Sequence, residues 1–150
     1  FWAKVTVVAV FLQFLLGAMI RHYKAAAIFG DHFPLLTAGF EGWESLVPQS
    51  WHFHQVVHYL HRLGVLVVTG VLLRWLGIAW SFPLIRRRHG LWMVTLMILL
   101  ALQILLGGMV VWTLRNPHVA TLHTLIGAGI FAISWGLFFC FHRSQREGLA

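Results

Sequence analysis

Four histidines in the segment 51–64, WHFHQVVHYLHRLG, are the residues of this chain best suited to chemistry. His54, His58 and His61 follow one another at i, i+4 and i+7, so they share one face of a helix. A neutral imidazole nitrogen binds transition metals, and the ring exchanges a proton near neutral pH. The segment runs directly into the apolar stretch VLVVTGVLL. Ionisable side chains at membrane depth usually face the bundle interior and carry function, so these histidines are the first candidates for a site.

The composition indicates a membrane protein. Of the 150 residues, 59% are hydrophobic and 10% are charged, which is too little charge to cover a soluble domain. A four-helix membrane bundle needs about this many residues at ~20 per span. The formal charge of +7 could suggest nucleic acid. The basic residues, however, sit at the ends of apolar runs, where they anchor and orient a chain, so we expect the lipid bilayer and no nucleic acid as partner.

One all-α domain of residues 1–150 is predicted, an integral membrane four-helix bundle with spans at 3–20, 52–80, 91–114 and 119–141. Pro117 is suited to begin the last helix. The connection SFPLIRRRHG carries three consecutive arginines, which predicts that it and both termini are cytoplasmic. The loop 21–50 and the turn RNPH then face outward. A chain that begins at Phe1 without a signal-peptide pattern is expected to be a processed product or a piece of a longer chain.

The two halves of the chain echo each other. QFLLGAM begins at Gln13 and QILLGGM begins at Gln103, while HRLG at His61 corresponds more loosely to HTLIG at His123. The shared Gln and Gly positions predict two related helix pairs.

The depths of two histidines agree. Arg74 is expected to snorkel to the cytoplasmic boundary, and His61 precedes it by thirteen residues, or about 20 Å of helix. In a core of roughly 30 Å, His61 then lies about 10 Å below the outer surface. His123 follows Pro117 by six residues, about 9 Å below the same surface. Two helices therefore bring an imidazole to one depth in the outer leaflet.

Two facing imidazoles can hold a heme iron as axial ligands, so the predicted cofactor is a low-spin, bis-histidine heme. Small residues would let the flat porphyrin approach the backbone, and Gly17, Gly107 and Gly127 are the main candidates. Helix packing through small residues is the alternative explanation for these glycines. A non-heme metal held by the histidines of the second span is less favoured, because the spans offer no carboxylate to complete it.

Heme propionates require cations near the water boundary. Arg21 and Arg115 are predicted at equivalent places in the two repeats, with interfacial anchoring as an equal alternative. His22 and Arg62 are further candidates. His58, one turn nearer water than His61, is expected to contact a porphyrin substituent or relay a proton. His52 and His54 are expected at the solvated interface, and the single cysteine, Cys140, as a small core or lipid-facing residue.

The motifs LQFLLGAMIRH, GDHFPLL, HYLHRLG and LQILLGGMVVWTLRNPHVATLHTLIGA together resemble the heme A synthase family, whose members assist cytochrome oxidase assembly. Family members have eight helices as two four-helix halves, each able to supply a histidine pair. The resemblance implies that His61 and His123 are the axial ligands of one half. The RH after the first span indicates the C-terminal half, which holds heme b.

The chain departs from the family pattern at three places. The catalytic half has a Glu three residues before the His-Arg pair, where this chain has His58. Many members carry two loop cysteines, where this chain has Gly30 and Leu36. The family oxidises a heme O methyl to a formyl group by successive hydroxylations. The resemblance thus implies an oxidoreductase half, completed by a second copy or a partner membrane subunit.

Two other functions are left open. One is a bis-histidine cytochrome b subunit that transfers electrons within a larger membrane redox complex. The other is a structural subunit without cofactor. The location expected in each case is a bacterial or archaeal cytoplasmic membrane, with any heme site toward its outer side.

Overall fold

A computed structural model of the chain describes residues 1–22 and 51–146. Four helices make up this part: α1 Trp2–His22, α2 Phe53–Trp80, α3 Pro83–Trp112 and α4 Pro117–Arg146. No strand occurs within the described ranges. All four helices are long and apolar enough to cross a membrane. The predicted all-α fold with four spans is therefore confirmed.

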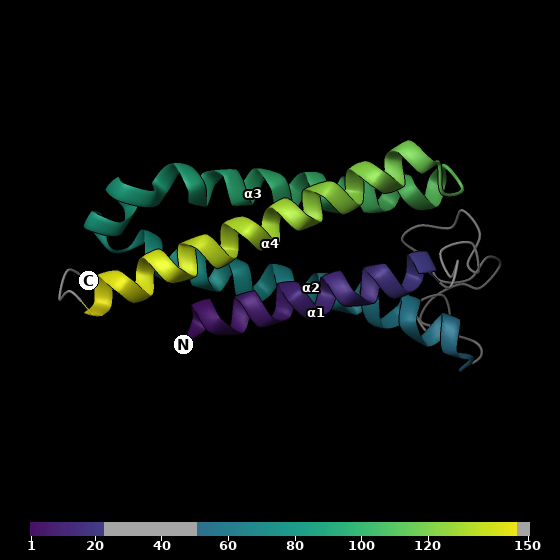
Figure 1. The fold of residues 1–150 in the computed structure, drawn as a ribbon, viewed down its shortest axis with the longest axis horizontal. Helices are drawn as coiled ribbons and strands as arrows, with labels where there is room; N and C mark the ends of the chain where they lie inside the picture. The colour runs from purple at the N-terminus through teal and green to yellow at the C-terminus, as the bar shows by residue number, and fades with distance from the viewer. Residues whose placement is uncertain (23–50, 147–150) are drawn as a thin grey trace, which may run out of the picture.

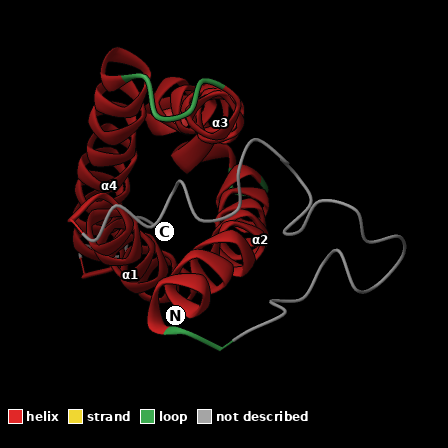
Figure 2. Cartoon of the chain, turned by 90° about the vertical axis from the view of Figure 1, so that its right-hand side faces the viewer, coloured by secondary structure: helices red, strands yellow, loops and turns green. Residues whose placement is uncertain are grey.

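The helices form two antiparallel pairs. α1 lies beside α2 and α3 beside α4, and the N-terminal end of α1 and the C-terminal end of α4 lie at one end of the bundle (Figure 1). The view along the bundle shows the α3–α4 pair stacked on the α1–α2 pair (Figure 2). α4 crosses obliquely, so its C-terminal end approaches the N-terminal end of α1. We call this end the terminal end and the end with the α3–α4 turn the turn end.

The connection between α2 and α3 is shorter than expected. Only Ser81 and Phe82 separate the two helices, so the arginines of SFPLIRRRHG lie in the first turns of α3 rather than in a loop. Pro83 stands at the start of α3, where its fixed φ suits a helix and its missing N–H costs nothing. The Ser81 hydroxyl donates to the carbonyl of Ile78 at 2.7 Å and closes α2.

The connection between α3 and α4 is a tight turn with strained backbone. Leu114 and Arg115 have φ values of 48° and 68°, which side-chain-bearing residues rarely adopt. The Arg115 N–H donates to the carbonyl of Val110, which closes the last turn of α3. α4 then begins at Pro117, as the sequence predicts.

The largest packed core lies toward the terminal end and joins the two pairs. Leu72 of α2 and Leu96 of α3 are 0% exposed, and Met93 is 1% exposed. The core also draws on α1 and α4 through Val10 and Ile130. Many other apolar side chains point outward, as expected of surfaces that face lipid tails. The bundle is thus held together mainly in the half that does not contain His61 and His123.

Replacement of Leu96 by Ala should destabilise the bundle by about 2–5 kcal/mol, because a fully enclosed side chain leaves a cavity. The matched control is Leu91→Ala on the same helix, since Leu91 is 77% exposed. Thermal unfolding in detergent should show a clearly lower melting temperature for Leu96→Ala and little change for Leu91→Ala. Equal losses would contradict this account of the core.

Candidate functional site

His61 and His123 each lie against a glycine of the neighbouring helix. A Cβ built on Gly17 of α1 would stand 3.2 Å from His61 Cε1, and one on Gly107 of α3 would stand 3.3 Å from His123 Cε1. Gly17 and Gly107 each lie five residues before the end of their helix. The two helix pairs therefore present their imidazoles at corresponding heights, near the turn end of the bundle.

A glutamine of the partner helix completes each arrangement. The Gln13 amide donates to the carbonyl of His61 at 2.8 Å, and its oxygen fills the place that a Cβ on Gly64 would take. Gln103 Nε2 lies 3.4 Å from His123 Nε2 and 2.9 Å from a Cβ built on Gly127. In both pairs, one helix supplies Gln and Gly one turn apart and the other supplies His and Gly. The residues that repeat in the sequence thus form corresponding contacts between helices in the two pairs.

The two helix pairs also meet beside these rings. Arg21, one turn beyond Gly17 on α1, bonds Thr124, the residue that follows His123 on α4. The His61 and His123 side chains are both half-buried, and the Nδ1 atom of each is buried without a hydrogen-bond partner among residues 1–22 and 51–146. Such buried nitrogens are rare in folded proteins and call for an explanation.

The predicted cations differ in their positions. Arg21, in the last turn of α1, donates from Nη1 to Thr124 Oγ1 at 3.4 Å and so links α1 to α4 beside His123. Arg115 lies in the turn beyond the end of α3. Arg21 follows Gly17 by four residues and Arg115 follows Gly107 by eight. The prediction that these arginines occupy equivalent places is therefore wrong, because Arg115 belongs to a turn and Arg21 to a helix.

Comparison with known proteins identifies a family. The COX15-CtaA family model, described as cytochrome oxidase assembly protein, matches residues 1–135. The chain belongs to this family, that of heme A synthase. No curated protein and no solved structure matches. The matched range contains every glutamine, glycine and histidine of the contacts above. The chain is an integral membrane protein with a heme A synthase-like role in cytochrome oxidase assembly.

His58, which stands where the catalytic half of the family has Glu, is more enclosed than its sequence position suggests. It is 4% exposed, whereas His61 is half-buried. His61 and Arg62 follow it by three and four residues, so the three residues share one face of α2. A small cluster of Val57 and Ile20 packs next to it between α1 and α2. Distance along the helix placed His58 nearer water, but its side chain turns into the bundle.

Other predicted residues lie apart from this group. His52 is exposed at the start of α2, His22 is exposed at the end of α1, and Cys140 is exposed on α4. Within residues 1–22 and 51–146, no three His, Cys, Asp or Glu side chains gather as a metal-binding group. Gly30 and Leu36, at the places of the family cysteines, lie outside the described residues, as do all four acidic residues.

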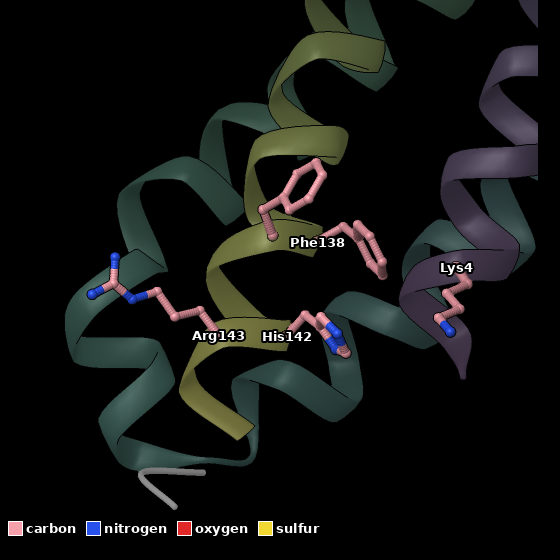
Figure 3. Close-up of a pocket in the computed structure, with 5 residues that line it drawn as sticks. Lys4, Phe138, His142 and Arg143 are labelled. Atoms are coloured by element: carbon pink, nitrogen blue, oxygen red, sulfur yellow. The ribbon is translucent and has the colours of Figure 1, made fainter. Parts of the chain in front are cut away.

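A surface groove of about 510 Å³ lies at the terminal end, away from the histidine pair. It is lined by Lys4 of α1 and by Phe138, Phe139, His142 and Arg143 of α4. His142 lies on the side of α4 nearer Lys4, while the Arg143 side chain extends away from it (Figure 3). The rings of Phe138 and His142 stack at 5.9 Å. Phe138 follows His123 by fifteen residues, or about 22 Å of helix. The groove is therefore separate from the His61–His123 site.

Replacement of Gly64 or Gly127 by Ala should destabilise the bundle by about 1–3 kcal/mol, because the new methyl group displaces a glutamine amide. Gly70 and Gly129 are matched controls on the same two helices, since a Cβ there meets nothing within 4 Å. Their Ala variants should be neutral or gain about 0.5–1 kcal/mol from helix propensity. Thermal unfolding in detergent compares the four variants. Equal melting temperatures for the Gly64 and Gly70 variants, and for the Gly127 and Gly129 variants, would contradict the Gln–Gly contact.

Proposed function

We propose that this chain binds one heme b between α2 and α4, with His61 and His123 as axial ligands, as one half of a heme A synthase-like assembly. The observation that carries the proposal is the pair of imidazoles. They stand at corresponding heights in the two helix pairs, which the Arg21–Thr124 hydrogen bond joins next to His123. Membership of the cytochrome oxidase assembly family supports the same conclusion.

The residues present fit a heme. Imidazole is a common axial ligand of heme iron, and one from each of two helices makes a bis-histidine, low-spin site. Gly17 and Gly107 remove side-chain bulk from the α1 and α3 faces next to the rings. The main packed core lies toward the other end of the bundle, so it does not occupy this level.

A heme bound here would supply one-electron redox chemistry, while the protein supplies ligands, orientation and charge. His61 and His123 would hold the iron, and their neighbours Gly17 and Gly107 set how close α1 and α3 come. Arg115 and Arg62 would offer guanidinium groups to the propionates, which favour charge-assisted hydrogen bonds. Arg21 and His22 extend the cationic rim at the end of α1.

The proposed reaction of the complete assembly is the family reaction, oxidation of heme O to heme A. This chain supplies one four-helix unit, and a second copy or a partner membrane subunit would supply the other. His58 would act as a proton relay or heme contact, because an enclosed imidazole can take the place of a carboxyl group in moving protons. The basic terminal end would face the cytoplasm of a bacterium or archaeon, so the heme would lie toward the outer side.

A second candidate function is electron transfer by a bis-histidine cytochrome b subunit. His58 in place of the catalytic Glu favours it. Extraction of the pigment from protein purified from its native membrane separates the two functions. Heme O or heme A in the extract supports synthesis, while heme b without substrate turnover, in the presence of the partner half, supports electron transfer.

His61→Ala and His123→Ala should each abolish the low-spin spectrum of the reduced protein, because one imidazole cannot make a six-coordinate iron. His52→Ala, at an exposed position of α2, is the control and should keep the spectrum. Absorption spectra and a pyridine hemochrome assay of heme per chain give the readout. An unchanged spectrum in either site variant would refute the ligand assignment.

Arg115→Ala should speed heme loss by roughly ten-fold, because a charge-assisted hydrogen bond contributes about 1.5 kcal/mol. Arg115→Lys keeps the charge and should stay closer to the wild type. Transfer of heme to an apoprotein acceptor measures the rate, and a redox titration measures the potential. Arg115→Gly removes the charge but suits the positive φ, so it separates charge from backbone strain. Loss of the fold in all three variants would contradict the assigned role.

A further inference from the structure

The two glutamines of the repeat make different contacts. Gln13 bonds the main chain of α2 at the carbonyl of His61, at 2.8 Å. Gln103 instead reaches the imidazole of His123, with 3.4 Å between the two Nε2 atoms. The flanking sequences, QFLLG and QILLG, are almost identical. Similar sequence positions therefore place an amide on the backbone in one pair and on the ring in the other.

This difference leaves the two rings unequal. Among residues 1–22 and 51–146, no side chain bonds the ring of His61, which lies beside the main chain of Gln13. In His123, Nε2 is engaged by Gln103, and the Cε1–Nδ1 edge lies against Gly107. The two rings thus differ at Nε2: that of His123 faces the amide of Gln103, whereas no side-chain amide among residues 1–22 and 51–146 bonds Nε2 of His61. A nitrogen lone pair that accepts a hydrogen bond cannot bind a metal at the same time.

We propose that Gln103 is a positioning residue that holds the His123 imidazole through Nε2 in the heme-free chain and leaves His61 as the open ligand. The consequence for cofactor loading rests on the proposed function. Heme binding through Nε2 of His123 requires the amide of Gln103 to leave, so the bond between them stabilises the heme-free state. Gln13 has no such effect, because its partner is a main-chain carbonyl that never binds iron.

The first test uses the heme-free protein. Gln103→Met and Gln13→Met keep a chain of similar length and remove the amide, so they form a matched pair. Nitrogen-15 NMR of the histidine rings reports the tautomer and hydrogen bonding of each imidazole. Gln103→Met should shift the His123 ring signals, while Gln13→Met should leave those of His61 unchanged and lower the melting temperature of the bundle. Unchanged His123 signals in Gln103→Met, or equal ring shifts in both variants, would overturn the proposal.

The second test is a hemin titration of the same proteins. Gln103→Met should bind hemin roughly two- to ten-fold more tightly, the factor that corresponds to one net hydrogen bond. Gln13→Met should show no gain. Weaker or unchanged binding in Gln103→Met would mean that Gln103 acts on the bound state or not at all, which overturns its role in the heme-free chain.

The two tests keep this inference separate from the proposed function. If wild-type protein binds no heme through His61 and His123, the proposed function fails, yet the ring signals still decide whether Gln103 holds His123. If the wild type binds heme in the low-spin form but the His123 ring signals do not change in Gln103→Met, this inference fails and the proposed function stands.

Discussion

The structure depends on how polar side chains are accommodated in an apolar bundle. An amide or imidazole taken from water into hydrocarbon costs several kcal/mol unless it finds a partner. The amide nitrogens of Gln13 and Gln103 meet this demand by reaching across to the neighbouring helix, where Gly64 and Gly127 make room for the amide, while neither amide oxygen has a hydrogen-bond partner among residues 1–22 and 51–146. One contact in each pair thus combines close approach of the helices with a partner for the amide nitrogen. It also sets the heights of His61 and His123.

Apolar packing and polar contacts lie at different ends of the bundle. The main apolar core joins all four helices toward the terminal end, around Leu72 and Leu96. Near the turn end, the contacts within each pair include the Gln–Gly and His–Gly contacts beside a small apolar cluster of Ile20 and Val57, and the hydrogen bond from Arg21 to Thr124 joins the pairs. Because stability rests mainly on one half, the other half can carry polar side chains that would weaken a packed core. This arrangement suits a bundle that has to admit a flat cofactor between its helix pairs.

Duplication of a helix pair does not make the two halves alike. The glutamines share a sequence context but contact different groups, and the arginines near them lie at different places in the fold. His58 on α2 has no histidine counterpart on α4, since Ala120 stands three residues before His123. A site built between two related pairs can therefore give each axial imidazole its own surroundings. Different surroundings are the means by which a protein tunes ligands of one type.

The sequence alone determined much of the architecture. Lengths of apolar runs predict four crossings, Pro117 marks the start of α4, and the Gln–Gly and His–Gly spacings predict two related pairs, because hydrophobic length and helical periodicity are local properties. The motifs also indicated the family that the comparison shows.

The contacts between helices could not be predicted from the sequence and were revealed only by the tertiary structure. The start of α3 at Pro83, the enclosure of His58 and the unequal partners of Gln13 and Gln103 depend on how each helix is rotated about its axis and on which neighbour it meets. A one-dimensional pattern gives depth along a helix but not that rotation. For this reason the levels of the histidines could be predicted from the sequence, while the atoms that touch them could not.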